Sequence, residues 1–191
     1  MVMKKIVIFA SGSGTNAENI IKYFENKAIA TVVAVFTNNP NAKVIERAKN
    51  FQVPTEIFSK EELTQGKVLQ KIIDFAPDLI VLAGFLLKLP KNIIESYPNS
   101  IINIHPALLP KYGGKGMYAM NVHKAVVENQ EKETGITIHF VNENYDEGNI
   151  IFQKSFELKG EETPDDVAEK IHELEQENFP TVIEKLLTSN F

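Results

Sequence analysis

Short apolar runs alternate with amphipathic segments over the first two-thirds of the chain. The first run, Ile6–Phe9, ends in a glycine-rich turn, and similar runs recur at 31–36, 78–84 and 100–104. Continuous apolar runs of this length are typical of strands that are buried on both faces, as in a parallel sheet. Strands that alternate with helices in this way predict an α/β fold with a doubly wound, mostly parallel sheet of the Rossmann-like kind.

The segments between these runs predict the helices. We expect Thr15 or Asn16 to cap a first helix, and further helices to span 42–49, 60–75 and 117–129.

The pattern changes near residue 136. Apolar residues alternate with other residues over 136–141, and a second alternating run covers 150–158. This period of two predicts a C-terminal antiparallel hairpin, joined by the polar loop 142–149. A final helix is expected to open at Thr163, and Pro180 is expected to kink or divide it.

Length and composition limit the classes of function. With 191 residues, the chain is expected to form one domain over 1–191. A net charge of −5 argues against a protein that coats nucleic acid or an anionic membrane. The absence of cysteine excludes a thiolate nucleophile and any cysteine-ligated metal. The longest strongly apolar stretch, 79–87, is far shorter than the about 20 residues of a membrane span, so we expect a cytoplasmic protein.

The turn after the first apolar run matches a phosphate-binding pattern. Gly12–Ala17 reads G-x-G-x-x-A between a predicted strand and a predicted helix, although Thr37–Asn39 holds no acid for a dinucleotide ribose. Small residues let a phosphate approach the N–H groups of a helix N-terminus, where the hydroxyls of Ser13 and Thr15 also lie. We expect a monophosphate site here, and a tight turn without a ligand is the alternative.

Asn103 and His105 are two positions apart at the end of a predicted strand, so their side chains share a face. Pro106 ends that strand and places both at its carboxyl edge, where open α/β sheets bind ligands. An amide at this position can donate to a developing oxyanion, and an imidazole can carry a proton. A carboxylate would orient such a histidine, and Asp146, Glu143 and Glu147 of the hairpin loop are the candidates.

Five motifs in one order make the resemblance specific. They are SGSGTN at 11–16, DLIVLAGF at 78–85, NIHPALLPKY at 103–112, TGITIHFVNENYDEG at 134–148 and the C-terminal helix. Over nearly its whole length the chain resembles the phosphoribosylglycinamide formyltransferase family. The resemblance implies transfer of the formyl group of 10-formyltetrahydrofolate to the amine of glycinamide ribonucleotide, in purine biosynthesis. It implies no metal and no redox cofactor. It also implies a phosphate-binding half over about 1–100 and a folate-binding and catalytic half over about 101–191.

The resemblance also implies roles for individual residues. Asn103 matches the residue that steadies the oxyanion, His105 the general acid, and Asp146 the carboxylate that raises the pKa of that histidine. The residues that match the ribonucleotide site are Gly14, Thr15, Asn16 and Glu175. The residues that match the folate pocket are Leu86, Leu87, Lys88, Leu89, Asn103, Val141, Asn142 and Glu143.

Some positions depart from the family pattern or are left open. Lys60 stands where some relatives use an arginine for the folate glutamate tail, so it offers a point charge without a bidentate fork. His139 is expected either in the wall of the site or on the other face of its strand. We expect His123 and His172 to be solvated on helices, and the Gly- and Met-rich segment 112–120 to be either a mobile cover or a surface turn.

Related activities remain as alternatives. A formyltetrahydrofolate deformylase and a sugar-nucleotide formyltransferase would share this domain, whereas a methionyl-tRNA formyltransferase would need a further domain. A nucleotide-binding module without catalysis would have no need of an oxyanion donor paired with an acid. The expected partners are small molecules, and the chain is expected to be a monomer or a homodimer.

Overall fold

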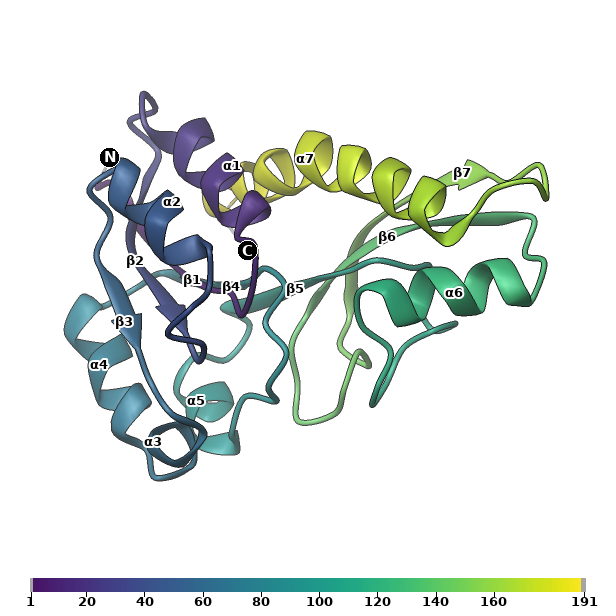
Figure 1. Ribbon diagram of the computed structural model, residues 1–191. Coiled ribbons are helices and arrows are strands. Elements are labelled where there is room, and N and C mark those ends of the chain that lie inside the picture. The colour runs from purple at the N-terminus through teal and green to yellow at the C-terminus, as the bar shows by residue number, and fades with distance from the viewer. Residues whose placement is uncertain (1, 190–191) are drawn as a thin grey trace.

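The computed structural model describes residues 2–189, and Met1 and residues 190–191 of the predicted domain lie outside the described residues. One seven-stranded sheet runs through the molecule in the order β3-β2-β1-β4-β5-β6-β7 (Figure 1). The strands are β1 (Lys4–Phe9), β2 (Ala30–Thr37), β3 (Thr55–Ile57), β4 (Leu79–Leu82), β5 (Ile101–His105), β6 (Glu133–Phe140) and β7 (Ile150–Glu157). The five from β3 to β5 are parallel, and β5, β6 and β7 pair antiparallel, so the predicted fold class is confirmed.

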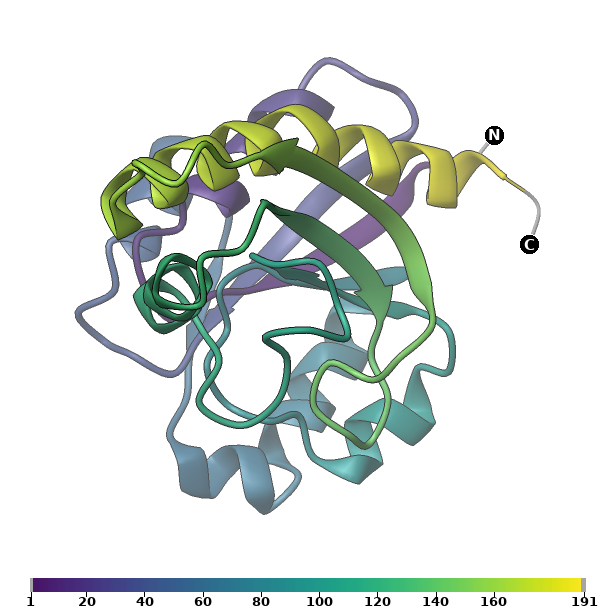
Figure 2. The ribbon, with the colours of Figure 1, turned by 90° about the vertical axis from the view of Figure 1, so that its right-hand side faces the viewer.

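Alternate side chains of β1 lie on opposite faces of the sheet, because successive side chains of a strand point in opposite directions. Ile6 and Ile8 pack with one buried cluster, and Val7 and Phe9 pack with the other. The first cluster holds the buried faces of α1 (Thr15–Phe24), α2 (Val44–Asn50) and α7 (Pro164–Thr188). The second holds those of α3 (Lys60–Thr64), α4 (Lys67–Phe75) and α5 (Lys91–Ser96). Helix α6 (Met120–Glu128) packs against α7, which crosses one face of the sheet in Figure 2.

The chain reverses its direction of winding at β1. This strand has β2 on one side and β4 on the other, so the loops that follow β1 and β4 part from each other at the carboxyl edge. A crevice opens at such a point in doubly wound sheets, and ligands bind there. No helix among residues 2–189 combines the length and the apolar character that crossing a membrane requires.

The helix predicted over 60–75 is wrong as a single element. The structure divides it into α3 and α4, with Gly66 at a φ of 83° between them. That left-handed conformation suits glycine and interrupts a right-handed helix. Smaller shifts occur elsewhere, because α2 and α6 begin two and three residues later than predicted.

The expected division of the final helix at Pro180 is wrong, because α7 continues without a break from 164 to 188. A proline inside a helix leaves the carbonyl four residues earlier without its N–H donor. Here that carbonyl belongs to Gln176, and the side-chain amide of Asn19 on α1 donates to it at 2.8 Å. The neighbouring helix therefore supplies the hydrogen bond that Pro180 removes, and α7 stays whole.

The residue that caps α1 is Gly14 rather than the predicted Thr15 or Asn16. Gly14 has a φ of 72°, and a Cβ built there would lie 2.4 Å from Val44 Cβ on α2. A Cβ at Gly12, by contrast, would meet nothing within 4 Å. The second glycine of the motif is therefore needed for backbone conformation and packing, and the first is not.

This contrast predicts a difference in stability between two alanine variants. Gly14→Ala should lower the free energy of unfolding by about 2–4 kcal/mol, through left-handed strain and the collision with Val44. Gly12→Ala, the matched control, should stay within about 0.5 kcal/mol of the parent chain. Urea unfolding measures both, and equal midpoints for the two variants would contradict this explanation of the turn.

Candidate active site

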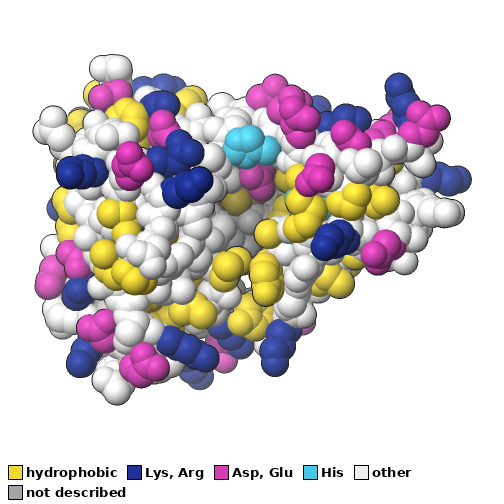
Figure 3. Space-filling view, in the orientation of Figure 1, with side chains coloured by type: hydrophobic (Ala, Val, Ile, Leu, Met, Phe, Trp, Pro, Cys, Tyr) yellow, Lys and Arg dark blue, Asp and Glu magenta, His cyan; other side chains and the backbone are white. Residues whose placement is uncertain are grey.

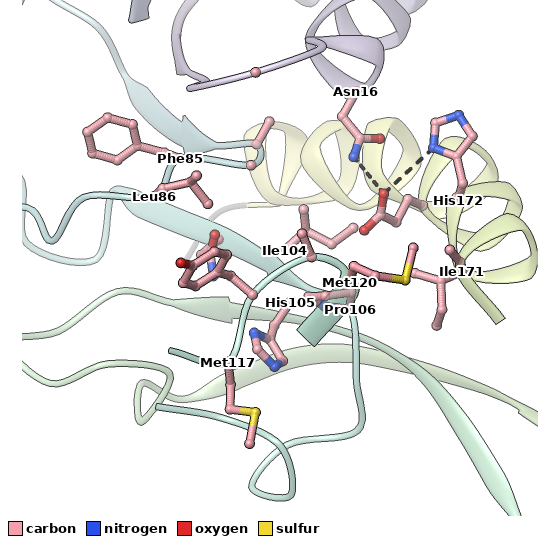
Figure 4. A pocket seen from close by; sticks show the side chains of 18 of the residues that line it. Asn16, Phe85, Leu86, Ile104, His105, Pro106, Met117, Met120, Ile171 and His172 are labelled. Carbon is pink, nitrogen blue, oxygen red and sulfur yellow. Dashed lines mark hydrogen bonds and ion pairs between the residues drawn. The ribbon is translucent and has the colours of Figure 1, made fainter. Parts of the chain in front are cut away.

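A cavity of about 590 Å³ opens at the carboxyl edge of the sheet. The turn after β1, the loop after β4, the end of β5, the first half of α7 and the 114–120 segment line it. Figure 3 shows the molecular surface hollowed there, and Figure 4 shows the lining side chains that converge on the hollow from these elements. The cavity therefore lies where the doubly wound topology predicts a ligand site.

The turn after β1 forms one end of the cavity, with Gly12–Asn16 among the lining residues. The first N–H groups of a helix have no intrahelical partner, so the start of α1 offers donors to an anion. Arg47 of α2 holds this turn from behind. Its Nε donates to the carbonyl of Ser13 at 2.8 Å, and its guanidinium pairs with Glu18.

Ser11 ties three strand ends together beneath this turn. Its buried hydroxyl donates to Asn38 Oδ1 at 2.6 Å and accepts from the backbone N–H of Leu86 at 3.0 Å. The carboxyl edges of β1, β2 and β4 are therefore fixed relative to one another. This role of Ser11 was not predicted, and the only sequence signal for it is a small polar residue directly before Gly12.

Asn16 and Glu175, both predicted as substrate-binding residues, are hydrogen-bonded to each other. Asn16 Nδ2 donates to Glu175 Oε2 at 2.8 Å, and Gln176 Nε2 donates to Asn16 Oδ1 at the same distance. His172 Nδ1 lies 3.9 Å from the same Glu175 oxygen, as the dashed lines of Figure 4 show. Residues 159 positions apart thus share one wall, because α1 and α7 pack on the same face of the sheet.

The expectation that His123 and His172 are both solvated is wrong for His123. Its side chain is buried, because it lies on the face of α6 that also buries Val122 and Val126. Burial lowers the pKa of His123, and its Nδ1 has no hydrogen-bond partner among residues 2–189. His172 is about half exposed, lines the cavity rim, and has its pKa raised by Glu175.

Asn103 and His105 lie at the other end of the cavity, on β5. The register of β5 against β6 sets Asn103 directly opposite His139, and Asn103 Nδ2 lies 3.1 Å from His139 Nε2. Since an amide N–H donates, Nε2 accepts, and Nδ1–H of His139 donates to the carbonyl of Phe140 at 2.9 Å. His139 is buried and does not itself line the cavity, but it contacts two lining residues, Asn103 and Asp146.

The Asp146 carboxylate comes back to both histidines from the hairpin loop. Its Oδ2 lies 3.6 Å from His105 Nδ1, and its Oδ1 lies 3.6 Å from His139 Nε2. The backbone N–H of Gly114 also donates to Oδ2 at 2.9 Å. Of the three candidate carboxylates, only Asp146 lines this cavity.

Burial and charge act in opposite directions on this cluster. Burial lowers the pKa of His105, while the charge of Asp146 and the hydrogen bond to the Tyr112 carbonyl act to raise it. Burial acts to raise the pKa of the Asp146 carboxyl, but the positive charges that His139 and His105 carry when protonated, together with the Gly114 N–H, outweigh it, so that pKa is lowered. The site therefore holds an ionised carboxylate beside a weakly basic imidazole.

The residues predicted for the folate pocket are only partly brought together. Leu86 is half exposed and lines the main cavity, and it also lines a neighbouring cavity of about 460 Å³. The predicted residues that line the neighbouring cavity with it are Leu87, Lys88, Leu89 and Glu143. Val141 and Asn142 line neither cavity. Val141 packs beside the second core cluster, and Asn142 Oδ1 accepts from the backbone N–H of Asn144.

Tyr145 of the hairpin loop joins the two cavities. Its side chain is exposed, it lines both cavities, and the Lys88 ammonium lies 5.5 Å from the centre of its ring. Lys60 and Lys91 also line the neighbouring cavity, where Lys91 Nζ lies 3.4 Å from Glu143.

Comparison with known proteins agrees with this geometry. Residues 4–183 match the sequence profile described as formyl transferase. The phosphoribosylglycinamide formyltransferase of Bacillus subtilis is 34% identical over 98% of this chain and 97% of its own length. The chloroplastic enzyme of that name from Arabidopsis thaliana is 35% identical over 94% of this chain, which spans 64% of that relative's length.

Among solved structures, glycinamide ribonucleotide transformylase 1 from Geobacillus kaustophilus superposes with a TM-score of 0.88. The alignment covers 97% of this chain and 99% of the other at 34% identity. The sequence matches and the structural superposition agree over nearly the whole chain. The chain therefore belongs to the formyl transferase family.

Proposed function

We propose that the protein transfers the formyl group of 10-formyltetrahydrofolate to the amine of glycinamide ribonucleotide. The products are formylglycinamide ribonucleotide and tetrahydrofolate, as in purine biosynthesis. The observation that carries the proposal is the single cavity that joins an anion-binding helix start to the Asn103, His105 and Asp146 cluster. Membership of the family and the names of the relatives support it.

The chemistry needs an oxyanion donor and a proton carrier. The amine attacks the formyl carbon, a C–N bond forms, and the carbonyl oxygen becomes an oxyanion. Asn103 has one amide N–H on His139, so its second N–H is the donor available to that oxygen. The bond to the folate N10 then breaks. N10 takes a proton from His105, and the proton that the attacking amine gives up restores the protonated His105.

The ribonucleotide is assigned to the end of the cavity near α1. Its phosphate would accept from the N–H groups of 14–16 and its ribose hydroxyls would donate to Glu175, which Asn16 already orients. In this assignment each end of the cavity draws on both predicted halves of the chain, because Glu175 lies at the ribonucleotide end and Leu86 at the folate end.

The folate is assigned to the end near Leu86 and Tyr145. Its ring would lie against the half-exposed side chains there, and its acidic tail would extend toward Lys60, Lys88 and Lys91 of the neighbouring cavity. These lysines outnumber the single acid, Glu143, in that lining, so the electrostatic balance favours carboxylates. The cytoplasmic location and the choice between monomer and homodimer stay predictions.

A direct assay tests the proposed function. Purified protein is mixed with 10-formyltetrahydrofolate, with and without glycinamide ribonucleotide, and the products are followed by mass. Formylated ribonucleotide that forms only with the acceptor is the expected result. Release of formate without any acceptor would instead establish a formyltetrahydrofolate deformylase. Formyl transfer to a sugar nucleotide, with none to glycinamide ribonucleotide, would establish a sugar-nucleotide formyltransferase.

His105→Ala should lower kcat by about 10²–10⁴-fold, because it removes the proton carrier. Far-UV circular dichroism and the melting temperature should show a folded protein. A His105→Ala variant with the kcat of the parent chain would exclude His105 as the acid.

Asp146→Asn should move the pH dependence of kcat. Removing the negative charge lowers the pKa of His105 further. An acid works only while protonated, so activity is present below that pKa and is lost as the pH rises through it. The basic limb of the profile should therefore shift to lower pH. Asparagine suits the left-handed backbone of this position, where φ is 55°, so the variant should fold. A limb at the parent pH would contradict this role for Asp146.

Glu175→Gln should raise KM for the ribonucleotide about tenfold and leave KM for the folate within twofold, because only the ribose end of the cavity loses its acceptor. Glu177→Gln, an exposed neighbour on α7 outside the cavity, is the matched control. Steady-state kinetics with each substrate varied in turn separates the two constants. Equal increases for both substrates would overturn the assignment of this end.

A further inference from the structure

A backbone carbonyl from outside the cavity lining contacts the candidate acid. His105 Nε2 lies 2.7 Å from the carbonyl oxygen of Tyr112, and the His105 side chain is 4% exposed. Tyr112 has a φ of 57°, the left-handed conformation that residues other than glycine rarely adopt. Strain of this kind persists only where surrounding contacts hold it, so the contacts of Tyr112 reveal what fixes its carbonyl.

Those contacts form a clasp made of Lys111, Tyr112 and Glu131. The Tyr112 hydroxyl donates to Glu131 Oε1 at 2.8 Å, and Lys111 Nζ lies 3.1 and 3.2 Å from the two Glu131 oxygens. The Tyr112 ring packs against the small cluster of Ala107, Val122 and Val126. Glu131 lies between α6 and β6, so the clasp ties the segment after β5 to the start of the hairpin.

None of the three clasp residues lines the main cavity or its neighbour. The side chains of the clasp are therefore placed to act through His105 and not on a substrate. Their effect follows from the chemistry of the carbonyl, which only accepts hydrogen bonds. Nε2 of His105 must carry a hydrogen in both protonation states, so the second proton is gained and lost at Nδ1, the nitrogen that faces Asp146.

We propose that the clasp of Tyr112 and Glu131 is a positioning device that holds the Tyr112 carbonyl on His105 Nε2 and thereby makes Nδ1 the proton-donating atom. The proposal rests on the proposed function only in naming His105 as the acid of the reaction. The tautomer of His105 is a property of the protein alone.

The ionisable groups that face His105 come from several elements. They are Asp146 of the hairpin loop, His139 of β6, Glu175 of α7 and His123 of α6. The clasp variants leave all four unchanged. Tyr112→Phe also changes no charge near neutral pH, so a change in the titration of His105 in that variant is attributable to the carbonyl contact.

The chain contains a matched control for the clasp. Tyr23 of α1 donates to Glu184 of α7, and Lys27, which follows α1, pairs with the same carboxylate at 2.8 Å. These residues form a second Tyr–Glu–Lys triad. Its three residues line neither the main cavity nor its neighbour. Tyr23→Phe removes the same kind of hydrogen bond as Tyr112→Phe, but it leaves the His105 contact in place.

The test is a pH titration of ¹⁵N-labelled imidazoles by NMR on the whole chain, with kinetics alongside. In the parent chain the ¹⁵N shifts should show His105 as the Nε2–H tautomer when neutral. Tyr112→Phe should mix the two tautomers and lower the pKa of His105 by about one unit, a tenfold loss of imidazolium at neutral pH. The value of kcat should fall about tenfold, and both KM values should stay within twofold.

Glu131→Gln keeps an acceptor for the hydroxyl and should fall between the parent and Tyr112→Phe in both readouts. If Tyr112→Phe does not fold, Glu131→Gln still tests the proposal, because it should also lower the pKa of His105. Tyr23→Phe should match the parent in tautomer, pKa and kcat. A parent His105 in the Nδ1–H tautomer, or clasp variants that titrate like the parent, would overturn the proposal. Normal tautomer shifts in a protein without formyl transfer would leave the clasp intact and reject the proposed function instead.

Discussion

The antiparallel pairing of β5 with β6 is the constraint on which the candidate site depends. Its register sets Asn103 opposite His139, and the hairpin that follows β6 carries Asp146 back to His105. A parallel continuation would have required a crossover connection of a dozen or more residues at this edge. The antiparallel turn instead closes the polar cluster with residues that are close in sequence, over 103–146. The parallel part of the sheet supplies the other end of the cavity through the turn after β1.

Burial gives this cluster its chemical character. Loss of water lowers the pKa of the His105 imidazole and acts to raise the pKa of the Asp146 carboxyl. The attraction between the charged forms of the two groups opposes both effects. The cluster is held by backbone as much as by side chains, because the Tyr112 carbonyl and the Gly114 N–H each contact one member. Two of the residues that provide or receive these contacts, Tyr112 and Asp146, have a left-handed backbone. Strain at a functional site of this kind is offset by the packing around it.

Much of the fold could be predicted from the sequence, because apolar runs and their spacing report burial directly. The order of strands and helices and the change to an antiparallel hairpin follow from patterns such as Ile6–Phe9 and 136–140. The places where helices continue or stop against these patterns could not be predicted, because they depend on tertiary contacts. Asn19 satisfies the carbonyl that Pro180 frees, and the approach of Val44 selects Gly14 as the cap.

The candidate site divides in the same way. Asn103 and His105 could be predicted, because a strand end fixes both their face and their edge of the sheet. No local pattern ranks the three loop carboxylates, and Asp146 was selected by the family resemblance. The burial of His123 and the clasp on Tyr112 required three-dimensional packing.

One measurement tests the account most directly: the crystal structure of the protein with glycinamide ribonucleotide and a folate analogue that cannot transfer its formyl group. The account predicts the phosphate on the N–H groups of 14–16, and the amine and the formyl carbon together between Asn103 and His105. A ribonucleotide phosphate bound elsewhere, or a formyl oxygen out of hydrogen-bond reach of Asn103, would contradict it.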